Sequence, residues 1–383
     1  MKFRLNDLAE VGSSKRIYAK EYKSSGIPFY RGKEIIAKSE GRKIDNSLFI
    51  SKDRYNTLLK KCGVPKENDI LISAVGTIGK VYHVAKSDIP FYFKDGNLIR
   101  IYNYNYSLID PYYLYYLLKS YCGQNAIRKI EIGSTQKAIT INELSSIVLD
   151  IPSLQKQQEI SNKLKKIDAL ISVNSEINDN LLDLVDTLFD NIIKCSILYK
   201  ATLNDIGTIA GGGTPSKKVN VYWNGKIPWL TPKDLSKSHS IFTSKGTRFI
   251  TEYGLKESSA RLFPAGTVLF SSRAPIGYIS IAKNNITTSQ GFKSIIPNKG
   301  YSPEFIYELL KKETPLIVRE ANGSTFKEIS GTRLKAHIVN IPSKEKAKYF
   351  DNSALSIFKL ISKNENENKI LKNLKKELLN KIF

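Results

Sequence analysis

The stretch Gly133-Ser134-Thr135-Gln136-Lys137 in the first half of the chain returns in the second half as Gly323-Ser324-Thr325-Phe326-Lys327. The dipeptide Ile151-Pro152 returns as Ile341-Pro342, each time just before a long polar segment. These echoes define a repeat of about 190 to 200 residues, which has the size of a domain and far exceeds the period of a solenoid. A duplicated domain presents two similar surfaces, so the chain suits a ligand that it contacts at two places.

The charge of the chain indicates the kind of ligand. With 383 residues the chain is long enough for two domains that each bury a core, and its formal net charge is +23. A protein with this excess of lysine and arginine usually binds a polyanion, most often nucleic acid. The alternative is compositional bias, visible in Lys-Asn-Glu-Asn-Glu-Asn-Lys at 363–369, but such bias does not require so few acidic residues. We therefore favour nucleic-acid binding.

Cysteine usage and hydropathy exclude several other classes. Cys62, Cys122 and Cys195 are too few and too scattered for a disulfide framework or a zinc site. The residues that follow Met1 contain no apolar run of a secretory signal, and no stretch approaches eighteen continuous apolar residues. We expect a cytoplasmic protein that does not span a membrane.

Local patterns predict mixed domains of strands and helices. An apolar run at 69–75, followed by glycines, predicts a strand and a tight turn, and 97–102 predicts a second strand. Asp110-Pro111 is typical of a helix start, because aspartate caps the first turn and proline is tolerated there. Ser302-Pro303 repeats this signal in the second half.

Two long amphipathic segments follow the two domains. From Pro152 to Cys195 apolar residues recur at steps of three and four, interrupted by Asn174 and Asn178, a polar pair typical of positions that fix helix register. The segment from Ile357 to Ile382 repeats the pattern. Each helix is predicted to have about 40 residues and a length of about 60 Å, more than a domain of this size can cover. We therefore expect an antiparallel helix pair with the domains at opposite ends, rather than helices that each lie on their own domain.

These patterns predict an α/β fold of the mixed α+β type with four segments. The expected segments are a first domain at 1–151, a central helix at 152–199, a second domain at 200–341 and a C-terminal helix at 342–383.

Motifs for catalysis are not found. His83, His239 and His337 have no neighbours at metal-ligand spacing, only His337 lies in a predicted strand, and we interpret all three as structural or surface residues. No phosphate-binding loop and no dinucleotide fingerprint is present. Gly-Gly-Gly-Thr-Pro at 211–215 is interpreted as a flexible turn that lets the backbone approach a partner. Asp-Pro-Tyr-Tyr at 110–113 lacks the second proline of the amino-methyltransferase motif, so we assign it to helix capping.

The paired Gly-Ser-Thr loops are the first candidates for nucleic-acid contacts. Their hydroxyls, backbone amides and lysines suit phosphate oxygens, and Gln136 could read a base edge, although an ordinary turn is the alternative. Arg273 could pair with guanine, and its counterpart by position is Val75, so the two domains would read different sequences. The segments 27–33 and 227–233 add basic residues beside aromatic ones, whose role is expected to be structural. The candidate DNA-binding residues are Arg31, Lys33, Ser134, Thr135, Gln136, Lys137, Thr214, Ser216, Lys217, Thr231, Lys233, Arg273, Ser324, Thr325 and Lys327.

Several of these stretches together resemble a known family. They are Gly-Gly-Thr-Pro-Ser at 212–216, Tyr-Trp-Asn-Gly-Lys-Ile-Pro-Trp at 222–229, the paired Gly-Ser-Thr loops, and Ile-Pro-Ser-Leu-Gln-Lys-Gln-Gln-Glu-Ile at 151–160. Over essentially its whole length the chain resembles the specificity subunits of type I restriction-modification systems. The first domain departs from this pattern with Gly-Ser-Ser-Lys-Arg at 12–16, and the second helix departs with Ser-Lys-Glu-Lys at 343–346. We therefore expect the recognition loops to differ and the two ends to bind their partners unequally.

The resemblance implies a function and a set of partners. It implies two target-recognition domains and two long helices packed as an antiparallel coiled coil. Such a subunit is not an enzyme: it binds a bipartite double-stranded DNA target, holds two methyltransferase subunits and is joined by restriction subunits. S-adenosylmethionine, ATP and magnesium would be bound by those partners, with no cofactor or metal in this chain. The alternatives are an enzyme with an unrecognised methyltransferase or nuclease site, and a scaffold whose helices merely dimerise.

Overall fold

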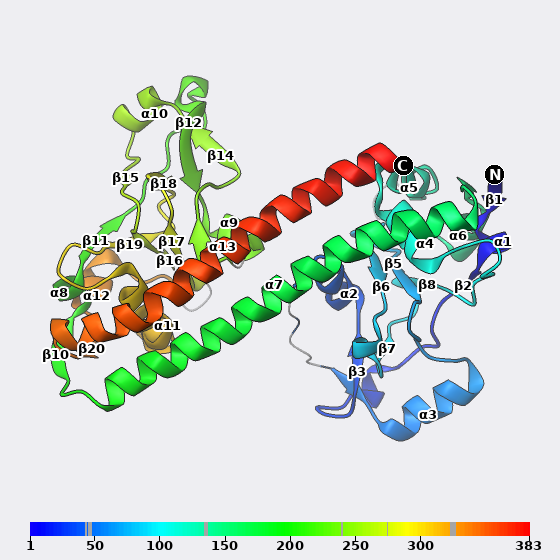
Figure 1. Cartoon of the computed structure of the whole chain (residues 1–383), viewed down its shortest axis with the longest axis horizontal. Coiled ribbons are helices and arrows are strands. Elements are labelled where there is room, and N and C mark those ends of the chain that lie inside the picture. The colour runs from blue at the N-terminus through cyan, green and yellow to red at the C-terminus, as the bar shows by residue number, and fades with distance from the viewer. Residues whose placement is uncertain (43, 45–47, 134–136, 239, 274, 322–326) are drawn as a thin grey trace. The chain divides into compact units, whose positions relative to one another are not determined.

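The computed structural model of the chain describes residues 1–42, 44, 48–133, 137–238, 240–273, 275–321 and 327–383. It divides into two compact units, Met1–Ile171 with Leu371–Phe383, and Ser172–Ile370. Two long helices, α7 (Leu154–Lys194) and α13 (Lys344–Ile382), each contribute to both units (Figure 1).

The first unit contains two small sheets. One has the order β2-β8-β5-β6 with antiparallel neighbours: β2 (Glu10–Gly12), β8 (Leu98–Tyr102), β5 (Ile70–Ser73) and β6 (Val81–His83). The other has the order β4-β3-β7: β4 (Phe49–Ile50), β3 (Ile27–Tyr30) and β7 (Tyr92–Phe93). A separate pair joins β1 (Lys2–Arg4) to β9 (Val148–Asp150). The helices are α1 (Leu5–Leu8), α2 (Gly32–Ser39), α3 (Lys52–Lys61), α4 (Pro111–Lys119), α5 (Tyr121–Lys129) and α6 (Ile141–Ser146).

The second unit repeats this topology and adds one edge strand to each sheet. The larger sheet has the order β11-β19-β16-β17-β13: β11 (Thr208–Gly211), β19 (Lys293–Ile296), β16 (Val268–Ser272), β17 (Ile276–Ala282) and β13 (Phe242–Thr243). The smaller has the order β14-β12-β18-β15: β14 (Arg248–Ile250), β12 (Trp223–Leu230), β18 (Ile286–Thr288) and β15 (Leu262–Phe263). β10 (Tyr199–Thr202) pairs with β20 (Ile338–Ile341). The helices are α8 (Leu203–Ile206), α9 (Pro232–Ser238), α10 (Glu252–Lys256), α11 (Pro303–Glu320) and α12 (Gly331–Ala336). The sequence repeat is therefore a repeat of the fold.

The elements predicted from local sequence are present. The strands expected at 69–75 and 97–102 are β5 and β8. The Asp110 carboxylate accepts a hydrogen bond from the Tyr113 backbone at 2.7 Å, and Ser302 caps α11 in the same way. Because β5 alternates its side chains, Ile70 and Ile72 pack with α4 while Leu71 joins a second buried cluster. Both faces of this sheet are therefore covered, which confirms the mixed α/β prediction.

The two long helices pack together in antiparallel fashion, as predicted. In the first unit, Lys375 Nζ lies 2.5 Å from Asp168 Oδ1. In the second unit, Asn174 contacts Asn368 and Asn178 contacts Asn364, so residue numbers fall along α13 as they rise along α7. The described chain contains no helix with the length and hydropathy needed to cross a membrane.

The low-complexity segment 363–369 lies within α13 and contributes to its packing. Asn364 and Asn368 are buried between the helices, and the Glu365 carboxylate accepts hydrogen bonds from the backbone amides of Ile241 and Phe242 at 2.7 and 3.3 Å. Burial raises the pKa of Glu365 to about 6, although both amides oppose the shift. These three residues of a low-complexity segment therefore make specific buried contacts.

Candidate nucleic-acid interface

In the first unit, the turn after β5 pairs with the residue that follows Lys137. The buried Ser73 hydroxyl donates to the Thr77 carbonyl at 2.5 Å and accepts from the Lys80 amide at 3.0 Å, which holds the turn. Ala138, directly after the loop lysine, forms a β-bridge with Val75. Val75 and Ala138 are thus neighbours although they are far apart in sequence.

The second unit builds the same arrangement. The Ser271 hydroxyl donates to the Pro275 carbonyl at 2.8 Å and accepts from the Tyr278 amide at 2.7 Å. Glu328, directly after the loop lysine, forms a β-bridge with Arg273. Val75 and Arg273 therefore occupy equivalent positions, as expected from the sequence.

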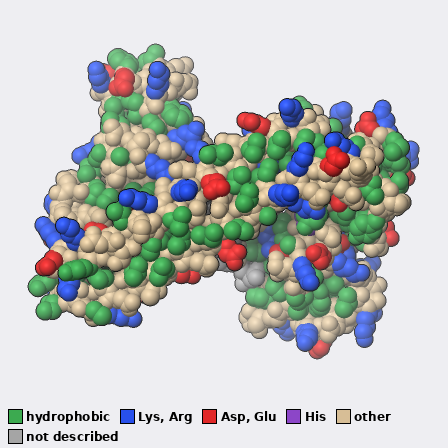
Figure 2. Space-filling view, viewed as in Figure 1, with side chains coloured by type: hydrophobic (Ala, Val, Ile, Leu, Met, Phe, Trp, Pro, Cys, Tyr) green, Lys and Arg blue, Asp and Glu red, His purple; other side chains and the backbone are tan. Residues whose placement is uncertain are grey.

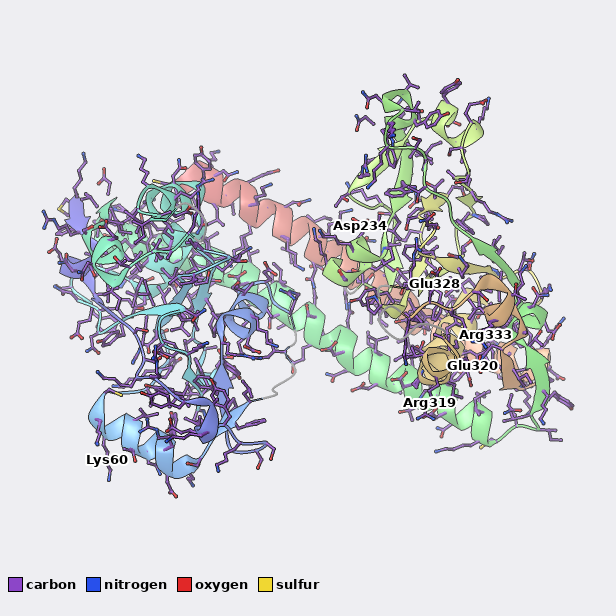
Figure 3. All side chains as sticks on the ribbon, turned by 180° about the vertical axis from the view of Figure 1, so that it is seen from behind. Lys60, Asp234, Arg319, Glu320, Glu328 and Arg333 are labelled. Carbon is purple, nitrogen blue, oxygen red and sulfur yellow. The ribbon has the colours of Figure 1, made fainter. Side chains whose placement is uncertain are left out.

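Lys137 is exposed, Arg273 is half-buried, and both cations have acidic partners. Lys137 Nζ lies 2.8 Å from the Glu131 carboxylate, and an Arg273 guanidinium nitrogen lies 3.5 Å from Glu328, which is labelled in Figure 3. Lys327 is exposed. Exposed ion pairs contribute little to stability, so a phosphate can replace these partners at small cost. The remaining predicted loop residues lie outside the described part of the chain: Ser134, Thr135, Gln136, Ser324 and Thr325.

A second pair of equivalent positions lies at the starts of α2 and α9. The Arg31 amide donates to Glu34 at 2.9 Å, and the Thr231 amide donates to Asp234 at 2.8 Å. Burial alone would raise the pKa of each carboxyl, but hydrogen bonds from these capping residues outweigh it and lower the pKa. The Arg31 guanidinium and the Thr231 hydroxyl bind the same carboxylates at 3.0 and 2.6 Å.

Lys33 and Lys233 follow these capping residues by two positions and are exposed. Because Arg31 and Thr231 already bind carboxylates, Lys33 and Lys233 are better placed than these capping residues to contact a phosphate. Direct DNA contact by any of the four stays a prediction. Over the face drawn in Figure 2, Lys and Arg side chains are more widespread than Asp and Glu.

The structure of the glycine loop before β12 differs from the flexible turn expected at 211–215. A Cβ on Gly213 would lie 1.9 Å from the Ser259 carbonyl oxygen, and one on Gly212 would lie 2.1 Å from the Thr288 hydroxyl. The Gly213 amide donates to the Thr288 carbonyl at 2.9 Å. The flexible-turn interpretation is wrong, because these glycines permit close packing against the chain itself. Beyond them, Thr214 is half-buried, and Ser216 and Lys217 are exposed.

The packing of this loop gives a stability prediction. Gly213→Ala is expected to lower the free energy of unfolding by about 1–3 kcal/mol, because backbone must move to admit the methyl group. Gly211→Ala is the matched control, since its nearest neighbour would be the Lys293 amine at 3.6 Å. Urea unfolding measures both, and equal stability of the two variants would contradict the role given to Gly213.

The two tryptophans are structural, as expected. The buried indoles of Trp223 and Trp229 donate to the carbonyls of Ser216 and Gly213 at 3.1 and 3.0 Å. The guanidinium carbon of Arg248 lies 3.7 Å from the ring centroid of Trp223. Arg248 is an exposed cation that sequence reasoning missed, because only the β12–β14 register places it opposite Trp229.

His337 forms structural contacts. His337 is buried, with Nδ1 2.9 Å from Glu320 and Nε2 3.1 Å from Glu313. Burial alone would lower the pKa of His337, but these carboxylates raise it. His337 precedes β20 and His83 ends β6, so the prediction that only His337 lies in a strand is wrong; His239 lies outside the described residues. Among the described residues no group of three His, Cys, Asp or Glu is placed to hold a metal.

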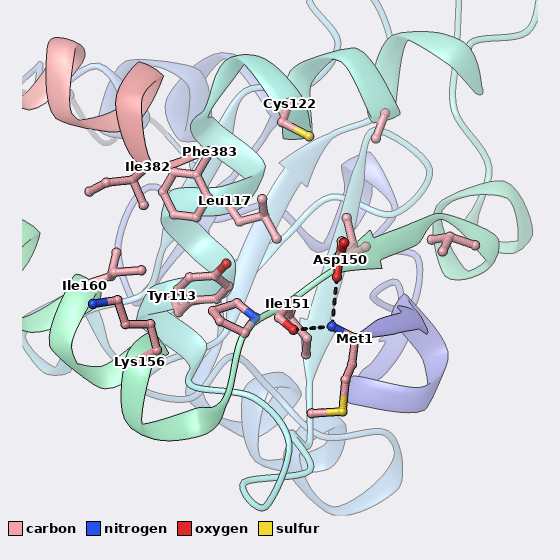
Figure 4. Close-up of a pocket in the computed structure, with 14 residues that line it drawn as sticks. Met1, Tyr113, Leu117, Cys122, Asp150, Ile151, Lys156, Ile160, Ile382 and Phe383 are labelled. Atoms are coloured by element: carbon pink, nitrogen blue, oxygen red, sulfur yellow. Dashed lines mark hydrogen bonds and ion pairs between the residues drawn. The ribbon is translucent and has the colours of Figure 1, made fainter.

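A pocket of about 510 Å³ lies in the first unit (Figure 4). Its lining is mainly apolar and includes Tyr113, Ile160 and Phe383. The Met1 ammonium donates to the Asp150 carboxylate and to the Ile151 carbonyl, both at 2.8 Å. The acid at this pocket is thus paired with a cation, an arrangement that does not resemble an acid–base catalytic pair.

These features define a class of protein: a duplicated mixed α/β domain with matched basic loops and two long helices packed antiparallel. The chain belongs to the family of type I restriction modification DNA specificity domains, whose model matches residues 1–182 and 199–380. The family expected from the sequence is therefore confirmed.

Individual relatives agree with this assignment. The chain is 46% identical over 184 residues to the MjaIX specificity subunit of Methanocaldococcus jannaschii, a match that covers 47% of this chain and only 42% of that relative. It is 23% identical over 399 residues to the HindI specificity subunit of Haemophilus influenzae, covering 83% and 86% of the two chains. The fold is similar to that of a type I restriction-modification S subunit from M. genitalium, with a TM-score of 0.59, 16% identity and coverage of 100% and 96%.

Proposed function

We propose that this chain is a non-catalytic, cytoplasmic specificity subunit that binds a bipartite double-stranded DNA target, with one half-site for each domain. The observation that carries this proposal is the repeated turn around Ser73 and Ser271, each bridged to the residue that follows a lysine. The two copies agree in the buried serine that holds the turn and in the exposed loop lysine, and the lysine suits a common phosphate backbone. They differ at Val75 and Arg273, where base recognition would require a difference.

A methyltransferase subunit would bind an exposed apolar stripe on α7. Val173, Ile177 and Leu184 are 50%, 39% and 47% exposed, and their spacing places them on one helix face. Figure 2 shows hydrophobic side chains gathered along this helix. Exposed apolar patches of this kind mark protein interfaces.

The repeat-equivalent positions on α13 differ from this stripe. Lys363 and Glu367 stand where α7 has Val173 and Ile177, so two methyltransferase subunits would bind unequally. Restriction subunits would join this complex. S-adenosylmethionine, ATP and magnesium would be bound by these partners.

The length of the helix pair would set the spacing of the half-sites. α7 has 41 residues and α13 has 39, which correspond to about 60 Å of helix each. Such a length suits half-sites separated by several base pairs of unread spacer. Shortening both helices by whole turns is then expected to change the spacer and to leave the half-site sequences unchanged.

Salt dependence tests the phosphate contacts. Lys137→Ala and Lys327→Ala are each expected to weaken binding to every duplex alike and to reduce the salt slope by about one. Lys60→Ala removes an exposed lysine from α3 and is the matched control (Figure 3). Equilibrium binding of labelled duplexes to the methyltransferase complex over a salt series measures these slopes. Slopes equal to that of Lys60→Ala would show that the loops do not contact phosphate.

Binding of S-adenosylmethionine, or cleavage of DNA, by the purified chain alone would favour the enzyme alternative. Failure to bind any duplex with the methyltransferase present would favour a scaffold.

A further inference from the structure

The polar contacts between the long helices are reciprocal. Asn174 of α7 donates to Asn368 of α13 at 3.1 Å, and Asn364 of α13 donates to Asn178 of α7 at 2.8 Å. Asn364 and Asn368 follow Ile341 at the same distances at which Asn174 and Asn178 follow Ile151. The asparagines therefore occupy the same places in both helices, and two copies of α7 could form the same contacts.

Two of the apolar positions along the helix pair do not discriminate between the helices either. By the same equivalence Ile167 corresponds to Ile357 and Ile171 to Ile361, so both helices carry isoleucine there. Neither the asparagines nor these isoleucines select α13, rather than a second α7, as the partner of α7. A different contact must select α13 as the partner if α7 is to pair with the α13 of its own chain.

One cluster does distinguish the helices. Lys375 Nζ lies 2.5 and 2.6 Å from the two carboxylate oxygens of Asp168, and the Tyr116 hydroxyl donates to the same carboxylate at 2.8 Å. The ammonium also lies 5.0 Å from the Tyr116 ring centroid. The equivalent positions in the other half are Phe358 for Asp168 and Val185 for Lys375, and both belong to one buried apolar cluster.

When α7 pairs with α13, Asp168 therefore meets Lys375 in the first unit, and Val185 and Phe358 lie in one apolar cluster in the second. A pair of two α7 helices would instead place Asp168 against Val185, and a pair of two α13 helices would place Lys375 against Phe358. Each arrangement leaves a charge facing an apolar side chain, which is strongly unfavourable. We infer that the Asp168–Lys375–Tyr116 cluster is a partner-selecting element, which directs α7 to α13 and disfavours association of two copies through like helices.

Refolding the full chain tests this inference. Two differently tagged copies are unfolded together, refolded at high concentration, and assayed for co-purification and for mass by light scattering. Asp168→Phe/Lys375→Val, which installs the apolar pair in both halves, is expected to raise co-purification several-fold over the original chain. Lys156→Ala/Glu159→Ala removes an exposed ion pair from the same helix and is expected to change nothing.

Two further variants keep the test decisive. Asp168→Lys/Lys375→Asp exchanges the charges and is expected to associate no more than the original chain, because like helices still mismatch. Asp168→Asn/Lys375→Gln is neutral and close in shape, and is expected to raise co-purification even if the apolar variant does not fold. The inference is overturned if neither uncharged variant raises co-purification, or if the charge-exchanged variant raises it equally.

Discussion

Val173→Glu/Ile177→Glu is expected to weaken binding of the methyltransferase subunit at least about 100-fold while leaving the fold intact. Both side chains are exposed in the chain by itself, so charge is tolerated before assembly. In the proposed complex they become buried, and an unpaired carboxylate in a packed interface costs several kcal/mol. Calorimetric titration of the methyltransferase subunit into the variant measures the loss.

The control adds the same charge outside the stripe. Gln158→Glu/Ser172→Glu alters two exposed polar positions on another face of α7 and is expected to bind nearly as well as the unaltered chain. Comparable losses in both variants would mean that charge on α7, rather than the apolar stripe, governs assembly. Tight binding by the Val173/Ile177 variant would place the methyltransferase elsewhere.

Arg273→Ala is expected to relax recognition at one base pair of one half-site. A bidentate contact from arginine to guanine discriminates by about 1–3 kcal/mol, or roughly 5- to 150-fold in relative affinity. The equivalent residue of the first domain is Val75, so the other half-site is expected to stay unchanged. Competition binding with duplexes substituted at each position measures the effect.

Lys327→Ala is the comparison for Arg273→Ala, because Lys327 directly precedes Glu328, which forms a β-bridge with Arg273. Its loss is expected to weaken all duplexes alike. If Arg273→Ala also weakens every duplex alike, Arg273 contacts phosphate and the second domain reads its bases through other residues.

The parts of the fold that follow local rules could be predicted from the sequence. Asp110 and Ser302 cap helices because the capping signal spans only four residues. The antiparallel helix pair followed from apolar periodicity and from helices too long for one domain. The repeat strengthened each prediction, since two copies gave the same pattern.

What the sequence did not show depends on contacts between distant segments. Arg248 packs on Trp223 only because β14 pairs with β12, and neither segment by itself determines the strand register. Gly213 packs closely against Ser259, which is distant in sequence. The sequence shows that glycine stands at this position, but not which neighbour requires it. Asn364 is the repeat equivalent of Asn174, which the sequence predicts to lie in the contact between the long helices. This equivalence would have indicated that Asn364 lies in the same contact, but the low-complexity surroundings concealed it.

The central claim is that this chain supplies the sequence specificity of a methyltransferase complex through two different domains. The most direct measurement is single-molecule methylome sequencing of a host that expresses the methyltransferase subunit with and without this chain. We expect a bipartite methylated motif with an unread spacer only when the chain is present, and a change in one half of that motif with Arg273→Ala. An uninterrupted motif, or the same motif without the chain, would contradict the account.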